Sequence, residues 1–173
     1  FSEAEGGKIG DSIHETDFVP VAKEIMEEAK KKGINFYKPI DVVYTNDFGN
    51  GVVSGMSDIH EIPEGYEGVD AGIKSRELFA NVIRDSKTVL MNGPAGVFEQ
   101  ENFANGTKAV LNAITEMTDK GGTSVIGGGD SVASVNKYSN PKNFSWVSSG
   151  GGASLEFCEG KTLPGVAGLE VNA

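Results

Sequence analysis

The stretch that decides the fold is Ser124-Val125-Ile126-Gly127-Gly128-Gly129-Asp130-Ser131-Val132. A short apolar run predicts a strand, three glycines predict a sharp turn, and an apolar pattern resumes where a helix would begin. Glycines let the backbone approach a ligand closely because they carry no Cβ. The first turn of the following helix would present unpaired N–H groups and the positive end of its dipole, which together favour an anion.

Asp130 adds to this turn a hard carboxylate oxygen, the kind of ligand that a phosphate-bound magnesium ion takes. We therefore interpret the stretch as the phosphate end of a nucleotide site. The same cluster is equally typical of an ordinary strand-to-helix turn that an Asp caps. It has neither the Gly-Lys-Ser/Thr ending of a Walker A loop nor the third glycine of a dinucleotide-binding fingerprint.

Strands and helices are predicted to alternate along the rest of the chain, from residue 16 onward. Apolar spacing predicts helices over about 16–33, 74–85, 102–119, 131–137 and 153–158. Further strands are predicted at 34–37, 41–45, 87–91 and 144–147, with irregular connections over 46–56 and 62–72. This alternation predicts an α/β fold with a mostly parallel sheet that helices cover on both faces.

Three glycine-rich segments, Asn92–Gly96, Gly127–Asp130 and Gly150–Gly152, each follow a predicted strand. Parallel strands deliver the segments after them to one edge of the sheet, where open α/β sheets bind their ligands. Gly150, Gly151 and Gly152 precede a helix and can offer backbone N–H donors to a phosphoryl group in transfer. A tight turn explains this last cluster equally well.

The segment after residue 91 carries groups suited to a nucleoside. Asn92 and Gly93 can contact phosphate or ribose, and Phe98 offers apolar surface. Glu99 can accept hydrogen bonds from ribose hydroxyls, although a lone Glu here is also typical of the start of a helix.

Composition limits the classes of partner. The chain has 173 residues with 15 Lys and Arg against 25 Asp and Glu, a net charge of −10, which argues against nucleic acid or an anionic membrane surface. No run approaches the roughly 18 apolar residues of a membrane span. The single cysteine, Cys158, excludes an internal disulfide, fits a reducing, cytoplasmic compartment and is expected to be buried. Trp146 is expected in the core, and His14 and His60 are expected to be exposed or locally bonded.

Three motifs resemble phosphoglycerate kinases: Asn92-Gly93-Pro94-Ala95-Gly96-Val97-Phe98-Glu99, Ile126-Gly127-Gly128-Gly129-Asp130-Ser131 and Val147-Ser148-Ser149-Gly150-Gly151-Gly152-Ala153-Ser154-Leu155-Glu156. Shorter matches extend the resemblance over essentially the whole chain, in order; they lie at 8–10, 39–41, 62–63, 68–72, 159–161 and 163–166. The chain departs from the family at Met91, Ile73 and Ser149, where the family usually has Trp, Pro and Thr.

The resemblance implies a three-layer, Rossmann-like domain, here a partial C-terminal nucleotide-binding domain over residues 1–173 without its first strands. It also implies that the N-terminal phosphoglycerate-binding domain is absent from this chain. The implied reaction is reversible phosphoryl transfer between 1,3-bisphosphoglycerate and Mg-ADP, giving 3-phosphoglycerate and Mg-ATP in glycolysis. The chain alone is expected to be inactive, and its parent is expected to be monomeric. A non-catalytic nucleotide-binding module is the alternative.

The resemblance also assigns roles to residues. Those that would shape the adenine and nucleoside pocket are Gly68, Val69, Gly93, Ala95 and Phe98. Glu99 would hold the ribose hydroxyls and Asp130 would coordinate magnesium. Gly128, Gly129 and Ser131 would receive the phosphates of ADP or ATP. Gly150–Gly152 would steady the phosphoryl group.

Overall fold

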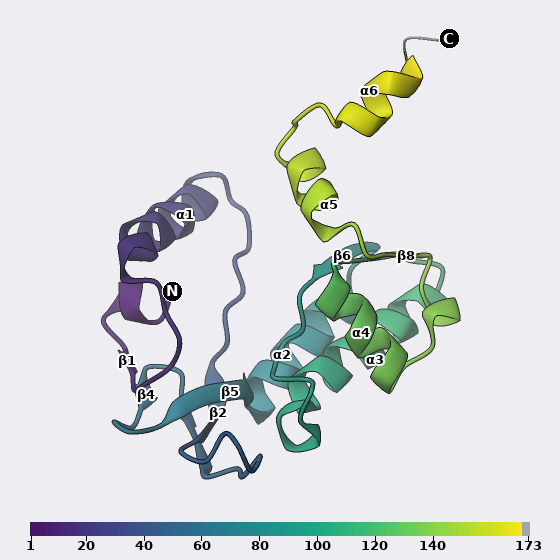
Figure 1. Cartoon of the computed structure of the whole chain (residues 1–173). Helices are drawn as coiled ribbons and strands as arrows, with labels where there is room; N and C mark the ends of the chain where they lie inside the picture. Colours follow the sequence, from purple (N-terminus) through teal and green to yellow (C-terminus); the bar gives the residue numbers. More distant parts are fainter. Residues whose placement is uncertain (171–173) are drawn as a thin grey trace.

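The computed structural model describes residues 1–170, and helices and strands alternate along most of their length (Figure 1). The strands are β1 (Lys8–Ile9), β2 (Asp41–Thr45), β3 (Gly55–Asp58), β4 (Glu61–Ile62), β5 (Glu67–Ala71), β6 (Thr88–Asn92), β7 (Thr123–Gly127) and β8 (Trp146–Ser148). The α-helices are α1 (Val19–Lys31), α2 (Ile73–Arg84), α3 (Asn105–Asp119), α4 (Gly129–Tyr138), α5 (Gly151–Cys158) and α6 (Pro164–Glu170). Among the described helices, none combines the length and apolar character that a membrane crossing requires.

The strands form three small sheets. Strands β6, β7 and β8 pair in parallel in that order, with Leu90 beside Val125 and Ile126 beside Val147. Strand β2 pairs antiparallel with both β3 and β5, and β1 pairs in parallel with β4. The predicted α/β class is confirmed, and the parallel pairing joins the three strands that lead into the glycine-rich segments.

The core lies where α3 and α4 pack on the parallel sheet. Seven buried side chains form its main cluster: Met91, Leu111, Ile114, Met117, Ile126, Val135 and Phe144. A second cluster packs Phe103, just before α3, against Val43 and Val69 of the antiparallel sheet. Burial of these apolar faces explains why the helix spacing read from the sequence is reproduced in the structure.

The strand predictions are wrong in two opposite ways. Residues 34–37 form no strand, because no other strand of the described residues lies beside them to complete the hydrogen bonding. Conversely, β5 and part of β3 lie in stretches that were predicted to be irregular. Gly68 and Asp70 interrupt the apolar pattern of β5, so its pairing with β2 has no clear local signal.

The expected burial of Trp146 and Cys158 is also wrong. Trp146 is 63% exposed because side chains alternate along β8, so that Val147 faces inward. Cys158 is exposed at the end of α5, which extends away from the parallel sheet (Figure 1).

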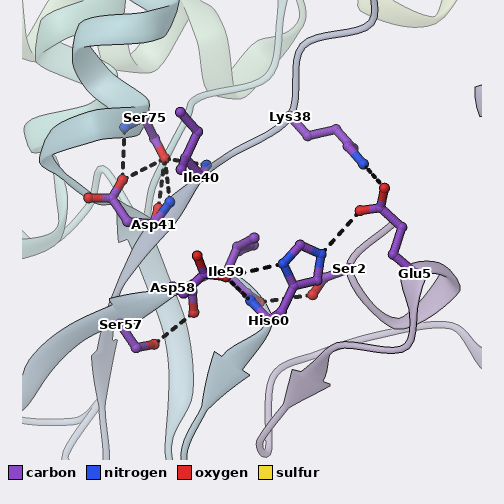
Figure 2. Close-up of polar contacts among 10 residues, drawn as sticks. All are labelled: Ser2, Glu5, Lys38, Ile40, Asp41, Ser57, Asp58, Ile59, His60 and Ser75. Atoms are coloured by element: carbon purple, nitrogen blue, oxygen red, sulfur yellow. Dashed lines mark hydrogen bonds and ion pairs between the residues drawn. The ribbon is translucent and has the colours of Figure 1, made fainter.

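Both histidines make local bonds, as expected. The Nδ1 atom of His14 lies 3.0 Å from the carbonyl oxygen of Ser12. The ring of His60 lies between two carboxylates, with Nδ1 3.1 Å from Asp58 Oδ1 and Nε2 3.1 Å from Glu5 Oε2 (Figure 2). Lys38 extends this series of contacts by forming an ion pair with Glu5. The hydrogen bond to Glu5 contributes most to raising the pKa of His60.

The N-terminus of α2 is capped from a different element. Asp41, on β2, accepts hydrogen bonds from the backbone N–H of Lys74 at 3.0 Å and of Ser75 at 2.8 Å, and from Ser75 Oγ at 2.7 Å (Figure 2). Gly72 stands before the helix, where a Cβ would lie 2.2 Å from Asp41 Cγ. Burial opposes the charge of Asp41, but these hydrogen bonds outweigh it and hold its pKa below the usual value.

Asp70 caps α3 in the same way but is nearly enclosed, being 4% exposed. Its carboxylate accepts hydrogen bonds from Ala71 N at 2.8 Å and from Gly106 N at 2.9 Å. A Cβ would lie 2.2 Å from Asp70 Oδ1 at Gly96 and 2.4 Å from it at Gly106. Burial has the largest effect and raises the pKa of Asp70 to about 6, against the opposing effect of the hydrogen bonds.

The two capping carboxylates, Asp41 and Asp70, are expected to make the stability of the chain depend on pH in opposite directions. Because the folded state favours protonated Asp70, its contribution falls as the pH rises from about 4 to about 6. Relative to the unchanged chain, the free energy of unfolding of Asp70→Asn should therefore increase over that interval. The expected increase is about 3 kcal/mol, at about 1.4 kcal/mol per pKa unit. Asp41→Asn, the matched control, should fall further behind as the pH rises toward about 4 from below, and its deficit should stay constant above that pH, because the folded state favours charged Asp41. Urea unfolding from about pH 2 to about pH 7 measures both, and shifts of the same sign would contradict the assignment.

Candidate functional site

The ends of the three parallel strands meet at one edge of their sheet. The N–H group of Gly128, after β7, donates to the carbonyl oxygen of Ser148 on β8 at 3.0 Å. The side chain of Asn92, at the end of β6, donates to the carbonyl oxygen of Gly151 at 3.4 Å. A cavity of about 250 Å³ opens between these ends, lined by Asn92, Gly93, Gly128, Gly129, Asp130, Ser131, Ser149, Gly151, Gly152 and Leu155.

Two glycines make this close meeting possible. Gly128 has φ 95°, in the left-handed region that other residues avoid. A Cβ on Gly151 would lie 2.6 Å from the Cα of Gly128, so any side chain there would force the two turns apart. These glycines are thus needed for backbone geometry whether or not a ligand binds.

The cavity is suited to an anion through its backbone. Helices α4 and α5 begin at Gly129 and Gly151, which both line it. Their first-turn N–H groups have no partner within the helix, and both positive dipole ends lie at this rim. The lining residues include no Lys or Arg. Fixed dipoles, and not cationic side chains, therefore give this cavity its attraction for negative charge.

Asp130 is exposed and lines the same cavity. Within residues 1–170, no group of three or more His, Cys, Asp and Glu side chains could enclose a metal ion. A single carboxylate fits magnesium nonetheless, since this ion commonly takes one or two carboxylates together with phosphate oxygens and water.

Ser131 has a structural bond that the sequence does not reveal. Its side chain is fully buried, and its Oγ accepts the N–H of Gly93 at 2.7 Å. The hydroxyl therefore fixes the turn after β6 against the first turn of α4. Its O–H group is still able to donate to a ligand oxygen.

The other predicted site residues lie around a second, larger cavity or in the loop beside it. Gly68, Val69 and Ala95 line a mainly apolar cavity of about 930 Å³ between α1 and strands β2 and β5. Its wall includes Pro94, Ala95 and Gly96, whereas Asn92 and Gly93 line the smaller cavity. The loop after β6 therefore borders both cavities.

Three predicted residues line neither cavity. Phe98 is buried in the core, Glu99 is exposed directly after it, and Gly150 is exposed beside the smaller cavity. The carbonyl oxygen of Gly150 accepts both the N–H of Ser154 at 3.1 Å and its Oγ at 3.0 Å. The carbonyl groups of Phe98 and Glu99 are held by Lys137 and Tyr138, which sequence reasoning did not single out. A Lys in the last turn of an amphipathic helix resembles any solvated end, so no local signal marks it.

Comparison with known proteins finds similarity over nearly the whole chain. The family described as phosphoglycerate kinase matches residues 1–161. Phosphoglycerate kinase from Coxiella burnetii superposes with a TM-score of 0.85 and 32% sequence identity, covering 92% of this chain and 41% of that one. The enzyme from Pyrococcus horikoshii OT3 gives a TM-score of 0.79 and 30% identity, covering 98% of this chain and 42% of that one. The chain thus spans about two fifths of the length of these relatives.

The contact between Gly151 and Gly128 gives a test of the site architecture. Gly151→Ala would place a methyl group against the Cα of Gly128, and we expect it to lower the free energy of unfolding by about 1–3 kcal/mol, as overpacking does. Gly152→Ala is the matched control, since no heavy atom outside its chain neighbours and the backbone of its own helix lies within 4 Å of its Cβ position. Urea denaturation measures both variants, and equal effects would show that the turns do not meet here.

Proposed function

The chain belongs to the phosphoglycerate kinase family, and from this premise we propose that it forms part of the nucleotide-binding domain of a kinase that transfers phosphoryl groups between 1,3-bisphosphoglycerate and Mg-ADP. One observation carries the proposal: three strand ends and two helix N-termini meet around the 250 Å³ cavity. Such an edge is where parallel α/β sheets bind ligands.

The phosphates of the nucleotide are proposed to enter the smaller cavity. There the N–H groups in the first turn of α4, beginning with Gly129, would meet them, with Asn92 and Gly93 on the facing turn. Gly128, whose own N–H donates to Ser148, would let the phosphates approach the backbone because it carries no Cβ. Asp130 would hold magnesium at the same rim, and the ion would supply neutralisation of phosphate charge. Among Gly150–Gly152, the N–H groups of Gly150 and Gly151 donate to Ser148 Oγ and to the carbonyl oxygen of Ser149. They would therefore hold the turn, while the N–H of Gly152 would act where charge develops during transfer.

The nucleoside is proposed to lie across the loop after β6. Gly68, Val69 and Ala95 face the apolar cavity on the far side of that loop, where a planar base can replace water. Phe98 supports the loop from the core, and the exposed carboxylate of Glu99 would accept hydrogen bonds from the ribose hydroxyls.

The charge of the chain favours a division of roles in which this chain binds the nucleotide and another part of the enzyme binds the phosphoglycerate. With a net charge of −10 and no cationic lining residue, the smaller cavity has no side chain to neutralise a phosphoglycerate. We propose that a separate N-terminal domain holds that substrate. We also propose that the whole enzyme is monomeric and that it is cytoplasmic, since the single cysteine fits a reducing compartment.

Binding of ADP should depend on magnesium through Asp130. We expect weak binding by the 173-residue chain in the presence of Mg²⁺ and a loss of about tenfold in Asp130→Asn, as removal of a metal partner typically causes. Asp119→Asn is the control, because it removes the same charge at the end of α3, away from the cavity. Isothermal titration with Mg²⁺ or with EDTA measures the effect. Equal Mg²⁺ dependence in all three proteins would exclude Asp130 as the ligand.

Turnover by the isolated chain is expected to be absent. Supplied with 1,3-bisphosphoglycerate and Mg-ADP, it should form no ATP above the uncatalysed rate, because positioning of both substrates is the main source of catalysis in phosphoryl transfer. A luciferase assay for ATP is sufficient. Binding without turnover also fits a non-catalytic nucleotide module, whereas substantial turnover would contradict the proposed division between domains.

A further inference from the structure

The last turn of α4 holds the backbone of the loop that carries Glu99. Lys137 Nζ donates to the carbonyl oxygen of Glu99 at 2.7 Å and to that of Phe98 at 3.2 Å. The hydroxyl of Tyr138 donates to the same Phe98 oxygen at 2.8 Å. Three hydrogen bonds from two neighbouring side chains therefore meet on two successive carbonyl groups.

These two donors are themselves held in place. Lys108, on α3, lies 4.8 Å from the centroid of the Tyr138 ring and also pairs with Glu101. Lys137 lies 5.2 Å from the same centroid. The hydrogen bond from Lys108 holds the pKa of Glu101 below its usual value, so the acidic member of the cluster stays charged. The cluster orients Tyr138 and Lys137 toward the loop before any ligand arrives.

The first turn of the same helix holds the other end of the loop. Ser131 accepts the N–H of Gly93, while Lys137 and Tyr138 hold the carbonyl groups after Val97. Residues 131 and 138 lie seven positions apart, about 10 Å at the rise of an α-helix. A loop fixed at two points on one helix keeps the spacing between them.

We propose that Lys137 and Tyr138 are positioning residues that set where the Glu99 carboxylate meets the ribose, while Ser131 fixes the phosphate end of the same loop. Helix α4 then acts as a spacer that matches the two ends of the nucleotide. This inference rests on the proposed nucleotide site. Pre-organisation of this kind increases affinity because the loop loses less freedom on binding.

A comparison of two nucleotides tests the inference in the 173-residue chain. The unchanged chain should bind Mg-ADP about tenfold more tightly than Mg-2′,3′-dideoxy-ADP, which lacks the ribose hydroxyls; tenfold corresponds to about 1.4 kcal/mol. In Lys137→Met and Tyr138→Phe, affinity for ADP should fall about five- to tenfold while affinity for the dideoxy analogue stays the same. Lys137→Arg, which keeps a donor, should retain the preference. Lys142→Met, in the turn after α4, is the charge-matched control.

Each outcome separates this inference from the function on which it rests. Failure of the unchanged chain to bind Mg-ADP, or equal binding of both nucleotides, overturns the ribose site and this inference with it. A preference that survives in Lys137→Met and Tyr138→Phe overturns the inference alone. A parallel loss for both nucleotides indicates a merely structural role and also overturns it. Urea unfolding shows whether each variant folds. If Tyr138→Phe does not fold, the comparison of Lys137→Met with Lys137→Arg is sufficient to test the inference.

Discussion

A single buried carboxylate joins the parts of this molecule that form the candidate site. Asp70 is the next-to-last residue of β5 and accepts the N–H of Gly106 in the first turn of α3, while Gly96 approaches it closely enough to form a bridge with it. The N–H of Val97 then donates to the carbonyl oxygen of Val69 at 2.9 Å. The loop after β6 is therefore anchored to the antiparallel sheet as well as to its own. Burying a carboxylate costs free energy because the group loses its hydration. The hydrogen bonds from the backbone offset this cost and hold the junction in place.

Glycines serve two separate purposes here, and the sequence does not distinguish them. Gly72, Gly96 and Gly106 leave room for the carboxylates of Asp41 and Asp70, which lie against their Cα atoms. Others serve at the rim of the cavity, where the strand ends must meet and where main-chain amides are needed. Some glycines of a glycine-rich motif in this chain are therefore needed for helix capping and others for the approach of a ligand. The atoms that an added Cβ would meet distinguish the two kinds.

Local patterns predicted what depends on near neighbours. Apolar spacing located α3 and α4, and the strand–glycine–helix order of Ser124–Val132 located the turn at the centre of the rim. Features with distant partners had no such signal. Asp41 and Asp70 cap helices from other strands, and residues 34–37 have strand composition but no adjacent strand among those described. Lys137 likewise had no local signal, because its acceptors lie in the loop after β6.

The rim is a set of fixed dipoles on a strongly acidic chain, and this combination restricts how a polyphosphate can be held. Backbone amides lose no conformational freedom when they bind and keep their strength in a site that excludes water. They carry only partial charge, however, so they cannot offset the long-range repulsion from a net charge of −10. The proposed site therefore orients a nucleotide more than it attracts one, and it depends on magnesium at Asp130 for the missing positive charge. Cations for the proposed second substrate would then have to come from outside this cavity, because its lining includes no Lys or Arg.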